Sequence, residues 1–283
     1  MLVRCRTRLT IIRAGAIGFI LFNCCGMAIA ADPPPETVNM VDTALIVAVD
    51  VSQSVDEARY RLQMEGIAQA LEDPGVLASV TSGPNGAILF SMVAWADTAR
   101  QAIGWQRIAS QADAFAVAKL LRNLPHEGGE FTCMARMLRT ISVTIIPAIS
   151  IKARRVVVDV SGDGIDNCTD IDGLHAERDR VLALGATING LPIIVPGEND
   201  VVGSGAYRAP GYGLRELPQR PDQEATTLDR WFRDHVIGGP GTFLMTAQGY
   251  DDFGRALRQK FVTEISAAQP WIGSISSKGT ITP

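Results

Sequence analysis

The chain has 283 residues, of which 47% are hydrophobic, and carries 26 lysines and arginines against 30 aspartates and glutamates. This hydrophobic content excludes an intrinsically disordered chain, and the length suffices for one large domain with a well-filled core. The formal net charge of −4 disfavours nucleic acid as a partner.

The N-terminal segment has the organisation of a secretory signal peptide. Arginines at positions 4, 6, 8 and 13 precede an uncharged apolar stretch from Ala14 to Ala30, which ends in small residues. We therefore predict a signal peptide over residues 1–30 and a periplasmic or secreted protein. The mature chain then has 22 of the 26 basic residues and all 30 acidic ones, so it is still more acidic. Contact with a membrane is expected only if the segment is not cleaved.

Continuous apolar runs predict parallel strands that are covered on both faces. The runs span residues 43–49, 87–95, 155–160, 187–195 and 242–247. A shorter segment, residues 100–105, predicts an antiparallel edge strand paired with 87–95. The residues Asp97-Thr98 between the two segments are suited to a tight turn, which joins antiparallel strands.

Helix-like segments alternate with these strands. They span residues 56–73, 112–123, 133–148, 172–184, 225–236 and 250–266. The alternation predicts an α/β fold with a doubly wound, mostly parallel sheet, helices on both faces and one antiparallel edge strand. We expect one domain over residues 43–268, with a long loop insertion at 196–223 and flexible flanks at 31–42 and 269–283.

Oxygen-bearing side chains follow two of the predicted strands. Asp50, Ser52 and Ser54 come directly after strand 43–49, and Asp163 lies in the segment SGDG after strand 155–160. In an open α/β sheet ligands bind outside the carboxyl ends of the strands, so both loops are expected at the same edge. Carboxylate and hydroxyl oxygens are ligands that suit Mg²⁺. The pattern therefore predicts a magnesium site at this edge.

The order DVSQS, GGEFT (residues 128–132) and SGDG resembles the von Willebrand factor type A (vWA) family over residues 43–266, and looks closest to an exported bacterial branch of it. In that family three such loops build a metal-ion-dependent adhesion site (MIDAS). The resemblance implies that a divalent cation, Mg²⁺ or alternatively Mn²⁺ or Ca²⁺, is held by Asp50, Ser52, Ser54, Thr132 and Asp163. It implies direct contacts from the serines and largely water-mediated contacts from the aspartates. A protein partner then supplies an acidic side chain to the vacant position.

The expected function is therefore an exported binding module and not an enzyme, but two alternatives remain open. In the first, Asp50 is the nucleophile of a Mg²⁺-dependent phosphohydrolase, although that chemistry generally uses a second acid where Ser52 stands. In the second, the domain is structural and its metal site is vestigial. A Ser–His–Asp hydrolase is disfavoured because the chain lacks a G-x-S-x-G motif.

Single residues of these loops also have plainer interpretations. Ser54, with a glutamate three residues later, matches a capping box for the following helix, and Asp50 suits the polar end of a strand. We interpret Asp172 as the N-cap of the helix after the third loop. Asp166 and Asp170 are interpreted as solvated surface charges, with Asp166 a minor candidate for water-mediated metal contact.

Two of the five cysteines lie outside the predicted signal peptide. Cys133 follows Thr132, and Cys168 lies five residues after Asp163, so loops that converge on one cation bring both thiols to one edge. In an oxidising compartment we expect a Cys133–Cys168 disulfide that ties the two loops together, with a pair of buried free thiols as the alternative. The three histidines show no paired ligand spacing, which disfavours a zinc site, and we expect them to be solvated.

Overall fold

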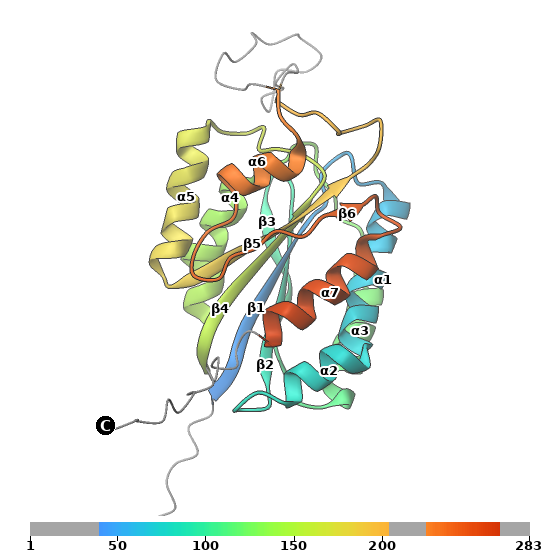
Figure 1. The fold of residues 1–283 in the computed structure, drawn as a ribbon, viewed down its shortest axis with the longest axis vertical. Coiled ribbons are helices and arrows are strands. Elements are labelled where there is room, and N and C mark those ends of the chain that lie inside the picture. The colour runs from blue at the N-terminus through green and yellow to red at the C-terminus, as the bar shows by residue number, and fades with distance from the viewer. Residues whose placement is uncertain (1–39, 204–224, 267–283) are drawn as a thin grey trace, which may run out of the picture. The chain divides into compact units, whose positions relative to one another are not determined.

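A six-stranded sheet forms the centre of the computed structural model, which describes residues 40–203 and 225–266 (Figure 1). The strands are β1 (Met40–Asp50), β2 (Ile88–Trp95), β3 (Ala99–Ile108), β4 (Lys152–Gly162), β5 (Ala186–Ile194) and β6 (Ala247–Gln248). Their order in the sheet is β3-β2-β1-β4-β5-β6. Only the pairing of β3 with β2 is antiparallel among the pairs of these strands. The predicted mostly parallel α/β sheet with one antiparallel edge strand is confirmed.

Helices cover both faces of this sheet. They are α1 (Glu57–Glu72), α2 (Pro74–Thr81), α3 (Gln111–Arg122), α4 (Met134–Thr140), α5 (Ile171–Ala183), α6 (Leu228–His235) and α7 (Phe253–Ser266). Figure 1 shows α1, α2, α3 and α7 on one side of the sheet and α4, α5 and α6 on the other. Within the described ranges no helix is both long enough and apolar enough to span a membrane. The predicted signal peptide and C-terminal flank lie outside the described residues, as do residues 204–223 of the predicted insertion.

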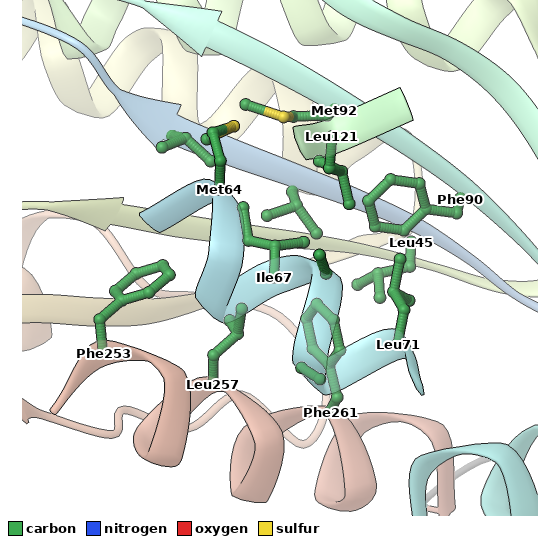
Figure 2. Close-up of a cluster of buried hydrophobic side chains, with 14 of the residues drawn as sticks. Leu45, Met64, Ile67, Leu71, Phe90, Met92, Leu121, Phe253, Leu257 and Phe261 are labelled. Carbon is green, nitrogen blue, oxygen red and sulfur yellow. The ribbon is translucent and has the colours of Figure 1, made fainter. Parts of the chain in front are cut away.

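The apolar run of β1 is continuous because both faces of the strand are buried. Leu45 points into the cluster that α1 and α7 complete, whereas Ile46 points into the cluster beneath α4 and α5. Figure 2 shows the first cluster, in which Ile67 of α1 lies between the sheet and Phe261 of α7. A strand buried on both faces needs apolar residues at consecutive positions, and the sequence of β1 satisfies this need.

The register of the central strands sets the position of the candidate site. β1 pairs in parallel with β4, and Val49 lies opposite Ser161. Asp50 and Gly162, the last residues of the two strands, therefore reach the same edge of the sheet. The loops that follow them start side by side.

The expected strand at 242–247 is wrong. Only Ala247 and Gln248 form β6, and Leu244 makes an isolated bridge to Gly190. Just before Leu244, the backbone N–H of Phe243 donates to the side-chain Oδ1 of Asn189 instead of to a strand carbonyl. Because a side chain takes the place of a ladder partner, the regular pairing cannot extend through these residues.

Two helical regions that contain a proline differ from the expected helices. Pro74 follows the end of α1 and begins α2, a helix absent from our expectation, with the Asp73 carboxylate as its N-cap. The expected helix 133–148 is α4 followed by a π-helical turn (Ile141–Ile145) and a 3-10 turn that contains Pro147. Proline has no N–H to donate and stops a regular α-helix, which explains the break before α2 and the end of the second segment near Pro147.

Candidate metal centre

The first loop begins where β1 ends. Asp50 is fully buried, and the backbone N–H of Ser52 donates to its Oδ1 at 2.8 Å. The N-cap of α1 is Asp56, whose carboxylate accepts from the N–H of Arg59. The interpretation of Ser54 as the helix cap is therefore wrong. The Ser54 hydroxyl is left to face the other loops.

Side-chain oxygens from three loops meet at this edge. The Oγ of Ser52 lies 3.3 Å from the Oγ of Ser54 and 3.4 Å from the Oγ1 of Thr132. The Ser54 hydroxyl donates to Oδ1 of Asp163 at 2.7 Å, across 109 residues of sequence. A Cβ added at Gly162 would lie 3.0 Å from Oδ2 of Asp50, so the start of the third loop also lies against that carboxylate. The structure thus brings all five predicted ligand residues together.

The second loop is tied to the third by backbone contacts and a covalent bond. The N–H of Thr132 donates to Oδ1 of Asn167, and the N–H of Asn167 donates back to the carbonyl of Thr132 at 3.1 Å. The next residue, Cys133, forms a disulfide with Cys168, with the two Cα atoms 5.0 Å apart. The predicted disulfide is confirmed, and it joins the two loops beside Thr132.

Asp166 has a structural task that the sequence interpretation missed. It is not a solvated charge, because it is only 3% exposed. Its Oδ2 accepts from the N–H of Ala135 at the start of α4, and its Oδ1 accepts from the N–H groups of Cys168 and Thr169. Burial raises the pKa of Asp166. This carboxylate therefore satisfies backbone donors around the disulfide instead of facing the candidate metal position.

Asp163 is held by residues that no local pattern indicated. Its Oδ2 accepts from the hydroxyl of Tyr250 at 2.9 Å and lies 3.9 Å from Nη1 of Arg59. Its backbone carbonyl accepts from the side-chain amide of Asn199 at 2.7 Å. These three residues come from the segment before α7, from α1 and from the connection after β5. Only the tertiary fold brings them to the third loop.

The electrostatics of the cluster fit a bound cation. Burial, and then the charge of Asp163, raise the pKa of Asp50 to about 8. Oδ2 of Asp50 is buried and accepts no hydrogen bond from the residues that the structure describes. An unpaired buried carboxylate oxygen is costly, and a divalent cation is the natural group to satisfy it. The donor set of two carboxylates and three hydroxyls consists of hard oxygens, as Mg²⁺ prefers.

The donor set differs from that of a site built from histidine, cysteine and acidic side chains. In the described part of the chain, no group of three or more such residues is arranged to hold a metal ion. The candidate site contains only two acidic residues, so it depends on Ser52, Ser54 and Thr132 for the remaining oxygens. A hydroxyl-rich site of this kind leaves more of the metal charge uncancelled.

A cavity of about 560 Å³ opens beside Ser52. The first loop contributes Ser52, Gln53, Val55 and Asp56 to its lining, and the second contributes His126, Gly128, Gly129 and Glu130. The cavity leaves room next to the hydroxyl cluster for a group from outside the molecule.

Two further expectations, on the N-cap of α5 and on the solvation of the histidines, are wrong. The N-cap of α5 is Asp170 and not Asp172, because Oδ1 of Asp170 accepts from the N–H of Gly173 at 2.8 Å. His175 and His235 are not independently solvated, since Nε2 of His175 lies 3.0 Å from Nδ1 of His235. These two histidines are 60 residues apart, so sequence spacing contained no sign of the pair.

Comparison with known proteins identifies a family and a fold for this chain. A family model described as "Protein of unknown function (DUF1194)" matches residues 40–269. No curated protein matches the chain.

Among solved structures, proximal thread matrix protein 1 from the mussel byssus, with a zinc-occupied MIDAS motif, matches with a TM-score of 0.51 at 15% identity. This match covers 79% of the present chain and 46% of that protein. The pilus adhesin SpaC from Lactobacillus rhamnosus GG, in its open conformation, matches with a TM-score of 0.51 at 12% identity, over 80% of this chain and 30% of that one. The chain thus spans less than half the length of these proteins, and the likeness shows the fold. The protein belongs to the DUF1194 family, and its fold is that of vWA domains.

Proposed function

We propose that this protein binds a divalent cation, with Mg²⁺ as the first candidate and Mn²⁺ or Ca²⁺ as alternatives, through Asp50, Ser52, Ser54, Thr132 and Asp163. The observation that carries the proposal is the fully buried Asp50, whose unpartnered Oδ2 lies beside the meeting point of the three loops. A structure of similar fold whose MIDAS holds zinc supports it.

We further propose that the loaded site engages an acidic side chain of a protein partner. A cation held largely by neutral hydroxyls supplies an incompletely cancelled positive charge, which attracts a carboxylate. Ser52 lines the cavity, which provides space for a partner's side chain beside this hydroxyl. The likeness to a pilus adhesin supports an adhesion or protein-interaction module. The Cys133–Cys168 disulfide indicates an oxidising environment and supports a periplasmic or secreted location.

The test of metal binding is calorimetric titration of Mg²⁺ and Mn²⁺ into the purified protein and its Ser52→Ala variant. We expect binding to the wild type and its loss in the variant. Ser91→Ala is the matched control, because Ser91 is also a buried serine but its hydroxyl donates to the carbonyl of Ile103 on the edge strand β3. Equal heats for the wild type and Ser52→Ala would show that the site is vestigial.

The partner is tested with immobilised protein and extracts of envelope proteins. We expect capture in Mg²⁺ that is reversed by chelator, competed by free glutamate and absent with Ser52→Ala. Capture that ignores chelator and glutamate would contradict recognition through a metal-bridged carboxylate. Turnover of a phosphate ester that depends on Asp50 and Mg²⁺ would instead support the phosphohydrolase.

A further inference from the structure

The carboxylate of Asp163 is held from both ends by protein hydroxyls. Ser54 donates to Oδ1 at 2.7 Å and Tyr250 donates to Oδ2 at 2.9 Å. Asp163 itself is only 7% exposed, so water contributes little to its orientation. Of the two hydroxyls, only that of Ser54 belongs to the predicted ligand set. Tyr250 reaches the site from outside the three loops.

Tyr250 is itself held firmly in place. It is 6% exposed and packs in the main core, three residues before the start of α7. The guanidinium of Arg59 lies over its ring, 5.1 Å from the ring centroid. Such cation–π contacts favour one placement of the ring, and with it one placement of the hydroxyl.

Arg59 links this arrangement to two more segments. Its Nη1 donates to the backbone carbonyl of Ser54 at 2.9 Å. Its Nη2 donates to both carboxylate oxygens of Glu198, at 2.7 and 2.8 Å, in the connection that follows β5. The planar guanidinium thus connects the first metal loop, the Tyr250 ring and Glu198 at once. A lysine cannot reproduce this forked geometry.

The arrangement has a consequence for the choice of metal. Mg²⁺ demands nearly ideal octahedral geometry at short distances, whereas Ca²⁺ accepts flexible coordination with variable distances. A group that fixes the orientation of a metal-binding carboxylate therefore matters more for Mg²⁺ than for Ca²⁺. Loss of such supporting partners typically weakens metal binding by about 10- to 100-fold.

We propose that Tyr250, supported by Arg59, is a positioning residue of the metal site that orients Asp163 and sets a preference for Mg²⁺ over Ca²⁺. This inference rests on the proposed function, because it assumes that the five-residue site binds a cation. The inference adds Tyr250 and Arg59, which lie outside the three loops, to the metal site, and it assigns to them control of the preference for Mg²⁺ over Ca²⁺.

The test is calorimetric titration of Mg²⁺ and Ca²⁺ into the wild type and the Tyr250→Phe variant, which keeps the ring and removes the hydroxyl. We expect Mg²⁺ binding to weaken by about 10- to 100-fold and Ca²⁺ binding by about threefold or less, so that the selectivity for Mg²⁺ falls. Tyr60→Phe is the matched control. Tyr60 is also buried, but its hydroxyl donates to the carbonyl of Pro125 and not to any of the five candidate metal ligands, and the Phe variant keeps the ring in place, so neither affinity changes.

A second variant guards against loss of folding. Arg59→Lys keeps the positive charge but breaks the fork between Ser54 and Glu198, and we expect the same fall in the Mg²⁺ to Ca²⁺ affinity ratio. Urea unfolding of each metal-free variant shows which of them is folded. An unchanged ratio in the folded variants overturns the inference. Failure of the wild type to bind any divalent cation overturns the proposed function itself, and the two failures are therefore distinguishable.

Discussion

Cys133 is bonded to Cys168, and this bond joins the segment that presents Thr132 to the loop that presents Asp163. The two cysteines are separated by 35 residues, yet each lies within five residues of a candidate metal ligand. The disulfide therefore has two consequences. It restricts the unfolded chain, and it limits the movement of the second loop relative to the third.

Replacement of both cysteines by alanine is expected to lower the free energy of unfolding by about 4 kcal/mol, the chain-entropy value for a loop of this length. Urea titration of the metal-free protein measures this change. We also expect Mg²⁺ affinity to fall by about tenfold, because Thr132 loses its tether to the third loop. Wild-type affinity in the variant would show that hydrogen bonds alone hold the two loops together.

Asp50→Asn is expected to stabilise the metal-free protein while it abolishes Mg²⁺ binding. Asp50 is fully buried, and among the described residues its Oδ2 has no hydrogen-bond partner, so folding without a cation either keeps a costly buried charge or takes up a proton at this carboxyl, whose pKa is raised to about 8. The amide carries no charge and needs no proton, and its oxygen still accepts from the N–H of Ser52. We expect a gain of roughly 1–3 kcal/mol, measured by urea unfolding in chelator. A clear loss of stability would mean that the Asp50 charge is already compensated within the fold.

Lys260→Met is expected to destabilise the protein by about 3–5 kcal/mol, because it leaves buried carboxylates without their cation. Lys260 of α7 is fully buried, and its ammonium pairs with Asp159 of β4 at 2.8 Å and with Glu264. Arg255→Met on the same helix is the control. Arg255 pairs with Asp252 at the exposed surface, where solvent screens the charges and loss of the ion pair has little effect on stability. Similar losses in both variants would contradict a special role for the buried pair.

The His175–His235 pair is expected to make stability depend on pH. Burial lowers the pKa of both histidines, and for His235 the neighbouring His175 adds to the effect. A depressed pKa means that the unfolded chain binds more protons. The stabilisation is therefore complete above the ordinary histidine pKa of about 6.5 and is lost as the pH falls through the folded values.

The measurement is urea unfolding between about pH 7.5 and 5 for the wild type and the double variant His175→Gln/His235→Asn. The amides occupy similar positions and do not titrate in this range. We expect a shallower decline of stability in the variant. Parallel curves for the two proteins would show that the histidine pair does not contribute to the pH dependence.

Most strand positions and the polar loops after β1 and β4 could be read from local patterns. The run before Asp50 is apolar at consecutive positions because β1 is buried on both faces, and the polar loop after it must lie at the carboxyl edge of a parallel sheet. The wrong predictions concern places where several nearby residues could form the same local interaction. Asp170 and Asp172 both suit an N-cap, and the Asn189 side chain, invisible to a pattern of apolar residues, interrupts the expected last strand.

The sequence by itself determined the α/β architecture and the oxygen-bearing residues after β1 and β4, because hydrophobic periodicity and loop chemistry are local properties, whereas Thr132 became a candidate through the resemblance to the vWA family. Only the tertiary structure decided what surrounds those residues. Tyr250 reaches Asp163 across 87 residues and Lys260 meets Asp159 from a different element, contacts that no spacing along the chain encodes. These contacts form because the packing of α7 against the sheet brings Lys260, and the segment with Tyr250 before the helix, close to β4 and the loop after it. Packing depends on the whole core and not on local sequence.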